Sequence, residues 1–566
     1  MLRLHIPRDS RVILGVALAF LVATLLTPSQ NFTYADDSLP FAVSTWAGHR
    51  TIPHHLILGV LHAFNHMLGH TGPHDLPLAL QTFRVYVALM SCMSLLLMGH
   101  LSLRWFGSLR VALVSMLAVA FTYGFWCYSI VTDVYVEALA CVLLAVFLAE
   151  RSYDSRRPAA AYAWLVAAAF ATLFAAINHQ SECLVVLSIG AVLLFARAGV
   201  LVFAERLKRA AIYVGTTGAL GLATFYAAYA QARPATDFIT WIRGYTAWME
   251  LTPDDKPSAM TPVFTALGIA RAIVYPELSM HFARAYQVVH GRFSLKLLMD
   301  DRFLSHGMSD GAVTAVLILD AIVLLAVPVM LVAAVREGLR RPPRAAGFWM
   351  LLLWIPVQAP LFALWEPASN EMWIWLLPCI GLIGVGLATS AAQRGAARAV
   401  PWVVVAALLI ANGTVVALYS DPGNCIYRTN KTYLMKVGAN DLAVAPYLYP
   451  SSDLTLLLPR QAPQVEPKEG AFEFADPDFQ SAYARVRAGH GSIYLDPVLV
   501  MPVDTEIHLL RYRANTERAH VEAQLRALES DCARTGTPLY GVIRKGEPTL
   551  TFERYRPSGW LKWVAG

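Results

Sequence analysis

The chain has 566 residues, of which 57% are hydrophobic and only 15% are charged. A soluble chain carries about 25% charged residues, so this composition excludes an ordinary soluble protein and indicates one that lies mostly within a membrane. The net charge of +6 does not indicate nucleic-acid binding, because the Lys and Arg residues stand in short clusters between apolar runs.

The apolar runs predict the architecture. A helix crosses a bilayer with about 17–25 apolar residues. About eleven such runs occur, near residues 12–28, 78–101, 109–126, 131–149, 159–177, 183–203, 210–231, 312–335, 347–364, 372–390 and 400–419. No small-residue cleavage site follows the first run, so we expect an uncleaved signal anchor. We therefore predict an α-helical polytopic membrane body over residues 1–420.

The positions of Lys and Arg predict the orientation of this body. With the N-terminus in the cytoplasm, the inside segments hold roughly 18 Lys or Arg, in clusters such as "ERLKR" and "REGLRRPPR", and the short outside loops hold essentially one, Arg50. This asymmetry follows the positive-inside rule. We expect a bacterial inner-membrane protein with a cytoplasmic N-terminus and a C-terminal domain in the periplasm or outside the cell.

Two outer segments are too polar to span the membrane. The first outer loop, 29–77, contains "PHHLILGVLHAFNHMLGH" at 53–70, which we interpret as a helix on the membrane surface. The long outer loop, 232–311, contains "TPVFTALGIARAIV" and, after Pro276, apolar residues at helical spacing over 278–289. We expect two short surface helices there.

Residues 421–566 have the composition of a soluble domain. The strand-like runs "DLTLLLP", "GSIYLDP", "LYGVIRK" and "TLTFERY" alternate with the helical runs "PDFQSAYARVRAG" and "NTERAHVEAQLRALESDCAR". This alternation predicts a small α/β domain, without a Gly-rich phosphate loop. Cys425 and Cys532 lie in it and could form a disulfide in an oxidising compartment, but the sequence does not show whether they meet.

The stretch "TYADDSLP" places two adjacent carboxylates, Asp36 and Asp37, directly after the first span. A carboxylate at the outer surface could take a proton from an acceptor hydroxyl as a general base, and its neighbour could bind a metal ion or the acceptor. The alternative is a solvated turn in which an Asp caps the following helix.

A group of histidines follows in the first outer loop. Because His55, His62 and His66 could lie on one helical face near the two aspartates, a divalent metal site is one hypothesis. The alternative is imidazoles at a wet interface. The full set is His54, His55, His62, His66, His70 and His74.

Further polar residues stand at the outer ends of later spans. Asp133 and Glu137 are four residues apart and so share a helix face. Because a charge deep in a span costs about 3 kcal/mol on insertion scales, we expect these two acids to line a polar cavity. His179 marks the next outer turn, and Glu366 and Asn370 lie between two tryptophans that could alone be membrane-belt residues.

The long outer loop supplies candidate cations for a phosphate. They are Arg243, Arg271 and Arg284, with His281. The guanidinium fork of Arg suits phosphate oxygens. The alternative is that these side chains extend to lipid headgroups.

These motifs together resemble the GT-C glycosyltransferases, nearest to their protein O-mannosyltransferase-like branch. The similar stretches are "ADD" at 35–37, "PHH" at 53–55, "TDVYVEALA" at 132–140 and "WEPASNEMWIWLLP" at 365–378. The acidic pair here is Asp–Asp where the family commonly has Asp–Glu, and the family's β-trefoil insertion has no counterpart.

The resemblance implies inverting transfer of a hexosyl or pentosyl group from a polyprenyl-phosphate donor to a lipid, glycan or protein of the cell envelope. It makes Asp36 the first candidate base and Asp37 the second. The residues expected to bind substrate are His54, His55, Asp133, Glu137, His179, Arg243, Arg271, His281, Arg284, Glu366 and Asn370. No cofactor is assigned beyond the possible divalent metal.

Two other classes of function remain as alternatives. One is a multi-pass transporter or lipid flippase, since acids and histidines within spans also mark ion and substrate paths. Against it, the polar residues gather at one face and no repeated halves occur. The other is a membrane-anchored scaffold, which would not need the acids at the outer face.

Overall fold

The computed structural model of the chain describes most of the membrane body and part of the C-terminal region. The described residues are 7–29, 44–46, 55–70, 76–195, 202–248, 258–282, 285, 305, 308–341, 343–392, 396–421, 438, 440–444, 464–465, 473–489, 491–495, 523–524, 526–528, 530–531, 534 and 539–540.

The chain forms two compact units. The first, here called the helical body, comprises Met1–Pro28, Pro40–Pro276 and Val316–Val416. The second comprises Ser29–Leu39, Glu277–Ala315 and Ala417–Gly566.

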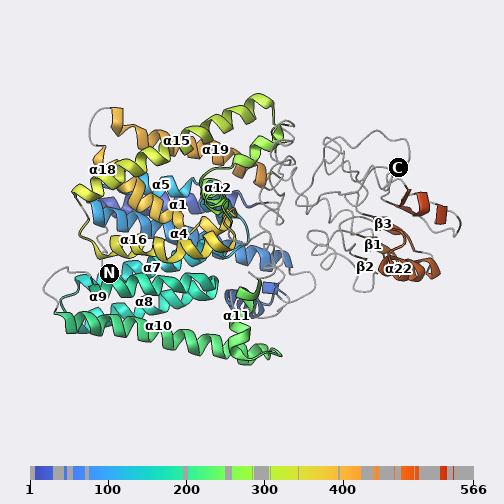
Figure 1. Cartoon of the computed structure of the whole chain (residues 1–566), viewed down its shortest axis with the longest axis horizontal. Coiled ribbons are helices and arrows are strands. Elements are labelled where there is room, and N and C mark those ends of the chain that lie inside the picture. Colours follow the sequence, from blue (N-terminus) through green and yellow to red (C-terminus); the bar gives the residue numbers. More distant parts are fainter. Residues whose placement is uncertain are drawn as a thin grey trace. The chain divides into compact units, whose positions relative to one another are not determined.

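A helix occupies every one of the apolar runs that the sequence predicted as spans (Figure 1). The helices are α1 (Arg8–Leu26), α4 (Leu76–Phe106), α5 (Leu109–Ala120), α6 (Tyr123–Ile130), α7 (Tyr135–Asp154), α8 (Pro158–Asn178), α9 (Val185–Phe195), α10 (Phe203–Ala232), α15 (Asp310–Arg340), α16 (Ala346–Trp365), α17 (Leu376–Cys379), α18 (Gly386–Ala391) and α19 (Val400–Ser420). The prediction of an α-helical polytopic membrane protein is confirmed.

Fewer of these helices qualify as spans than the eleven expected. Among the described residues, 7 helices are long and apolar enough to cross a membrane, or up to 8 if the bent pair α5–α6 is one span. The 7 are α1, α4, α8, α10, α15, α16 and α19. Helix α7 has sufficient length but carries Glu137, Glu150, Arg151 and Asp154, and the helices Gln180–Phe195 and Leu376–Ala391 are shorter.

The predicted run 109–126 is not one straight helix, because α5 and α6 meet at an angle of 65°. At the break, Thr122 has an extended backbone and its hydroxyl donates to the carbonyl of Val119 at 2.7 Å. The carbonyl freed at Phe121 accepts a hydrogen bond of 2.7 Å from Asn412 of α19. A buried carbonyl outside a helix needs such a donor, so α19 stabilises the bend.

The two polar outer segments contain short helices. The helix expected over 53–70 is α3 (Ile57–Met67), and "TPVFTALGIARAIV" forms α12 (Thr261–Ile273). The second surface helix expected after Pro276 is instead a short 3-10 turn over Pro276–His281, and the residues beyond it lie mostly outside the described part. One helix was not predicted, α11 (Phe238–Trp248).

The described part of the C-terminal region contains a parallel sheet, one helix over 477–488, and further helical residues at 523–524, 526–528, 530–531 and 534. The strands β1 (Leu442–Val444), β2 (Gln464–Val465), β3 (Ile493–Leu495) and β4 (Leu539–Tyr540) follow the order β2-β1-β3-β4. Each neighbouring pair is parallel, and α22 (Pro477–Ala488) begins after the capping carboxylate of Asp476. Parallel strands with a helix agree with the α/β fold expected here.

Several predictions for the C-terminal region have individual outcomes. The runs "GSIYLDP" and "LYGVIRK" contain β3 and β4, and "PDFQSAYARVRAG" contains α22. The strands β1 and β2 were not predicted. The runs "DLTLLLP" and "TLTFERY", together with Cys425 and Cys532, lie outside the described residues.

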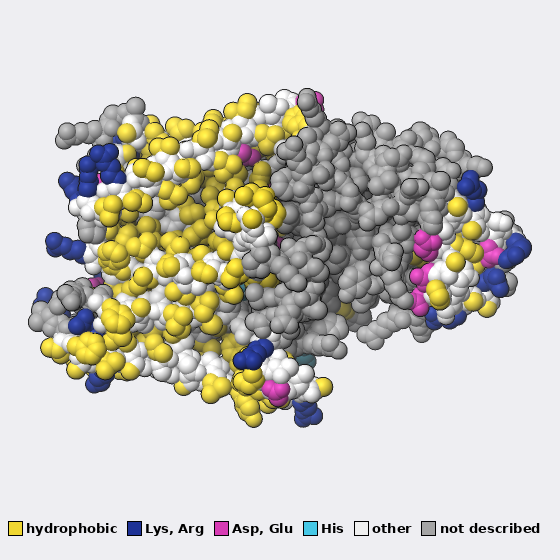
Figure 2. All heavy atoms as spheres, in the orientation of Figure 1, with side chains coloured by type: hydrophobic (Ala, Val, Ile, Leu, Met, Phe, Trp, Pro, Cys, Tyr) yellow, Lys and Arg dark blue, Asp and Glu magenta, His cyan; other side chains and the backbone are white. Residues whose placement is uncertain are grey.

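One end of the helical body is basic. Figure 2 shows Lys and Arg side chains gathered there, whereas hydrophobic side chains cover the helices between the ends. We call this region, where α4 and α7 end and α8 and α10 begin, the basic end. Helix α7 has 20 residues. At 1.5 Å per residue it is about 30 Å long, which matches the hydrocarbon thickness of a bilayer.

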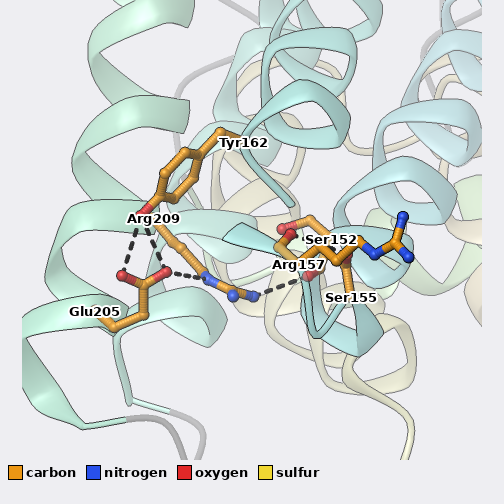
Figure 3. Close-up of polar contacts among 6 residues, drawn as sticks. All are labelled: Ser152, Ser155, Arg157, Tyr162, Glu205 and Arg209. Carbon is orange, nitrogen blue, oxygen red and sulfur yellow. Dashed lines mark hydrogen bonds and ion pairs between the residues drawn. The ribbon is translucent and has the colours of Figure 1, made fainter. Parts of the chain in front are cut away.

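Buried polar contacts join the helices at the basic end (Figure 3). Arg209 of α10 donates from Nε to Glu205 at 2.9 Å and from Nη1 to the carbonyl of Ser152 in α7 at 2.8 Å. The hydroxyl of Tyr162 in α8 donates to both oxygens of Glu205. This cluster therefore connects three helices.

Candidate active site

The candidate site lies at the end of the helical body opposite the basic end. There α6 and α8 end, α7 begins, and the loop 366–373 follows α16. We call this region the polar end. Helices α7 and α8 run between the two ends in opposite directions, so Tyr135 and Asn178 lie at the polar end while Asp154 and Pro158 lie at the basic end.

His55, which precedes α3, is anchored on the end of α8. Its Nδ1 atom lies 3.1 Å from the carbonyl oxygen of Asn178, and its ring centroid lies 5.5 Å from that of His179. Both imidazoles are buried. Burial lowers the pKa of His55 to about 4, although the contact with Asn178 opposes this shift. Burial, with His55 as neighbour, holds the pKa of His179 well below its usual value, so both rings are neutral at neutral pH.

Asn178 also connects this pair to α4. Its side-chain oxygen accepts a hydrogen bond of 2.8 Å from the hydroxyl of Tyr86. Glu137 of α7 is close enough to Tyr86 to interact with it electrostatically. Glu137 is fully buried, and neither of its carboxylate oxygens meets a donor from another residue in the described part. Glu137 therefore lies within the packed helices and does not border open space.

His179 continues the polar contacts in two directions. Its Nδ1 atom lies 2.6 Å from the hydroxyl of Ser181, which also accepts a weak hydrogen bond of 3.4 Å from Gln358 of α16. On the other side, its ring centroid lies 5.2 Å from that of Tyr135, at the start of α7. His179 is thus the residue at which contacts from α3, α7, α8 and α16 meet.

Two tyrosines join α6 and α7 to the loop 366–373. The hydroxyl of Tyr128 donates to Oε1 of Glu371 at 2.7 Å, and that of Tyr135 donates to Oε2 at 3.2 Å. Asp133 lies between the two tyrosines in sequence, is buried, and interacts electrostatically with Tyr128. The carboxylates of Asp133 and Glu371 therefore both lie near the phenol of Tyr128.

The loop 366–373 is held from the other side by α12. Nη1 of Arg271 in α12 donates to the carbonyl of Ala368 at 2.6 Å. Within the loop itself, the indole of Trp373 donates to the carbonyl of Pro367 at 2.9 Å. Asn370 precedes the short 3-10 helix that carries Glu371, and Glu366 directly follows α16. Both predicted residues of this loop thus lie at the polar end.

The structure brings together five of the predicted site residues through this chain of contacts and their loop. They are His55, Asp133, His179, Glu366 and Asn370.

The other predicted site residues lie elsewhere. Glu137 lies deeper, and Arg271 contacts the loop backbone. Arg243 is exposed on α11. His281 belongs to the second unit, where it contacts Ser305 at 3.1 Å and Asp310 at 3.0 Å. Asp36, Asp37, His54 and Arg284 lie outside the described residues.

The described histidines of the first outer loop do not share a metal site. His55 faces Asn178, the ring of His62 lies 3.3 Å from the carbonyl of Thr45, and His66 is exposed. No group of three His, Cys, Asp or Glu side chains that could hold a metal ion occurs among the residues described. A metal ion bound by Asp36 or Asp37 stays a prediction.

Sequence analysis missed the residues that connect the site. Tyr86, Tyr128, Tyr135 and Glu371 were not assigned to it, although Tyr135 lies in "TDVYVEALA" and Glu371 in "WEPASNEMW". A tyrosine at the end of an apolar run looks like any residue of the membrane interface. Tyr128 and Glu371 are 243 positions apart in the sequence, so their hydrogen bond can be recognised only in the folded chain.

Comparisons with known proteins give structural likeness without sequence matches. No profile of a known family matches the sequence, and no curated protein matches it significantly. The chain is similar to the crystal structure of ArnT from Cupriavidus metallidurans bound to undecaprenyl phosphate, with 12% identity, a TM-score of 0.49, and coverage of 84% of this chain and 87% of that one.

It is also similar to the Archaeoglobus fulgidus oligosaccharyltransferase tethered with an acceptor peptide, with 12% identity, a TM-score of 0.46, and coverage of 84% and 68%. For ArnT in the apo state the identity is 15%, the TM-score 0.42, and the coverage 81% and 85%. These proteins do not single out the protein O-mannosyltransferase branch that the motifs resemble.

Proposed function

We propose that this protein is a membrane glycosyltransferase that transfers a sugar from a polyprenyl-phosphate donor to a hydroxyl of an envelope lipid, glycan or protein. The observation that carries the proposal is the chain of contacts at the polar end, from His55 through His179 and Tyr135 to Glu371. These residues come from segments far apart in the sequence, and three of the segments are the "PHH", "TDVYVEALA" and "WEPASNEMWIWLLP" stretches that resemble the GT-C family.

The phosphate of the donor is a good leaving group, so its departure needs little acid catalysis from the protein. The bond from the anomeric carbon to the phosphate oxygen breaks, the acceptor oxygen bonds to that carbon from the opposite side, and the phosphate leaves as polyprenyl phosphate. Asp36, or Asp37 in its place, takes the proton of the acceptor hydroxyl, an effect worth typically about 10²–10⁴-fold. Arg243, Arg271 and Arg284, with His281, are the candidates for the donor phosphate.

Arg271 supports the site in a different way from the one first expected. It is buried and its guanidinium donates to the carbonyl of Ala368. We therefore assign it first to holding the loop 366–373, with contact to the donor phosphate as a second role.

An apolar cavity beside the polar end supports a lipid donor. It has a volume of about 320 Å³ and lies between α8, α9, α10 and α11, lined by residues that include Ala176, Cys183, Gly218, Gly221, Phe225 and Ile242. Helices α8 and α10 both qualify as spans, so a hydrocarbon chain is the natural occupant. Part of the donor's isoprenoid chain would lie here, with its phosphate near the polar end.

The charge distribution supports an orientation with the basic end in the cytoplasm and the polar end outside. A reporter that is active only outside the cytoplasm should be active when fused after residue 420 and inactive when fused at Gly338 in α15. The opposite pattern would invert the orientation and place the polar end on the cytoplasmic side.

Deletion of the gene, followed by mass spectrometry of envelope lipids, glycans and proteins, tests the proposed function in the cell. We expect one glycosylated species to disappear and a gene for the intact chain to restore it. A gene carrying Asp36→Asn should not restore it, because Asn keeps the shape of the side chain without the base. If neither Asp36→Asn nor Asp37→Asn impairs restoration, the acidic pair is only a capped turn.

A further inference from the structure

Glu371 differs from the other well-bonded acids of the helical body. Glu150 bonds to Arg104 and Trp105, and Glu205 bonds to Arg209 and Tyr162, so each has a cationic partner. The hydrogen bonds of Glu371 come instead from two neutral phenols. No Lys or Arg forms an ion pair with it in the part of the chain that the structure describes.

The position of Glu371 is fixed with little freedom. Tyr128 and Tyr135 hold one carboxylate oxygen each, and their rings pack edge to face with centroids 5.8 Å apart. Gly268 of α12 is packed so tightly against the loop 366–373 that a Cβ atom there would lie 2.3 Å from the carbonyl oxygen of Pro367 and 2.6 Å from Nε1 of Trp373. Both the side chain and the loop that carries it are therefore pre-positioned.

Glu371 is also accessible where its neighbours are not. Its side chain is partly exposed, whereas Tyr128, Met372 and Trp373 are buried. A carboxylate has about four lone-pair positions, of which the phenols use two. An oriented carboxylate with free acceptor positions and no cationic partner suits ligands that donate hydrogen bonds from neutral groups.

We propose that Glu371 binds the hydroxyl groups of a sugar ring, with Tyr128 and Tyr135 as the residues that orient it. The inference rests on the proposed function and specifies which group recognises the sugar. The ring can belong to the donor or to a glycan acceptor, because both offer the same hydroxyls. Hydrogen bonds from hydroxyls to an ionised carboxylate are stronger than those between neutral groups, so they favour sugars over the lipid surroundings.

The test uses the purified full-length chain in lipid nanodiscs. Polyprenyl-phosphate glucose, mannose and arabinose are supplied first without acceptor, and release of polyprenyl phosphate to water is measured. For the sugar that the intact chain uses, deoxy analogues lacking one hydroxyl each are then compared. With deoxy acceptors in place of deoxy donors, the same comparison reports on the acceptor sugar.

We expect Glu371→Gln to raise the KM for the sugar about 10- to 100-fold, and Tyr135→Phe or Tyr128→Phe to raise it less. For the intact chain, the deoxy analogue that lacks the contacted hydroxyl should have a KM higher by a similar factor. This increase should disappear in Glu371→Gln, because the two changes remove the same contact. Sensitivity to donor analogues assigns the contact to the donor, and sensitivity to acceptor analogues alone assigns it to the acceptor.

The matched controls are Glu337→Gln and Tyr226→Phe. Glu337 lies on α15 near the basic end, and Tyr226 lies on the exposed side of α10. Neither substitution should change the KM. Thermal unfolding of each variant shows that it is folded. If Glu371→Gln keeps the full dependence on every hydroxyl, the inference is wrong while the proposed function stands. If the intact chain releases no polyprenyl phosphate from any donor, the proposed function itself fails.

Discussion

Arg271 donates a hydrogen bond of 2.6 Å from Nη1 to the carbonyl oxygen of Ala368, so the end of α12 holds the loop that presents Asn370 and Glu371. This contact ties a segment expected to lie on the membrane surface to the loop between α16 and α17. Arg271 and Ala368 are 97 positions apart in the sequence, so the polar end depends on packing between distant parts of the chain.

Gly268→Ala tests that packing. The added Cβ would meet Pro367 and Trp373 at distances that atoms do not tolerate, so α12 and the loop 366–373 must separate. We expect a destabilisation of about 1–3 kcal/mol and a clear loss of activity. Gly15→Ala in α1 is the matched control, because its Cβ would meet no atom within 4 Å. Equal thermal unfolding midpoints and activities for the two variants would contradict this packing.

The cluster in Figure 3 predicts a stability effect without a direct effect on the site. Arg209→Met removes the ion pair with Glu205 and leaves the carbonyl of Ser152 without its donor. Because Arg209 is only 3% exposed, we expect a loss of about 3 kcal/mol. The exposed Arg340→Met, also near the basic end, should cost little. Thermal unfolding in detergent measures both, and a midpoint for Arg209→Met equal to that of Arg340→Met would refute the role of the cluster.

His55 predicts how stability depends on pH. Burial lowers its folded-state pKa from 6.5 to about 4. As the pH falls below about 6.5, the unfolded chain takes up a proton that the folded chain does not, so stability decreases between about pH 6.5 and about pH 4 and then levels off. His55→Gln should make this part of the curve shallower, with the shift at His179 accounting for what remains. The exposed His66→Gln is the matched control. A curve for His55→Gln equal to that of the intact chain would contradict the burial of this imidazole.

The cavity beside α10 predicts a specific effect on the donor lipid. A Leu side chain at Gly218 would enter the cavity, since a Cβ there meets no atom within 4 Å. Gly218→Leu should therefore raise the KM for long polyprenyl-phosphate donors more than for donors with a short chain. Gly215→Leu, also on α10 with open space but outside the cavity lining, is the control. An equal effect of the two variants on long and short donors would exclude the cavity as the site of the chain.

The sequence predicted the elements better than their contacts. Every apolar run is helical because apolar length and helix formation go together in a membrane, where the backbone must satisfy its own hydrogen bonds. The bend at Thr122 was not predicted, because the apolar run continues through it and the stabilising donor, Asn412, lies in α19. In the C-terminal region, β1 and β2 have only 3 and 2 residues, too few for a recognisable alternation.

The site was predicted in part for the same reason. His55, Asp133 and His179 stood out because polar residues beside apolar runs are costly and therefore informative. Glu371 lies in the stretch "WEPASNEMWIWLLP", but it was not among the expected site residues, whereas Glu366 was. What marks Glu371 is the pair of hydrogen bonds from Tyr128 and Tyr135, whose hydroxyls donate to its carboxylate. Local sequence contains no information about these hydrogen bonds.

The measurement that tests the central claim most directly is product formation by the pure protein reconstituted in sealed vesicles. Given polyprenyl-phosphate sugars, the intact chain should release polyprenyl phosphate, slowly with water and faster with the right acceptor, and Asp36→Asn should reduce that release by about 10²-fold or more. A protein that instead moves a substrate across the vesicle membrane, and cleaves no sugar–phosphate bond in any donor tested, would be a transporter and would contradict the account.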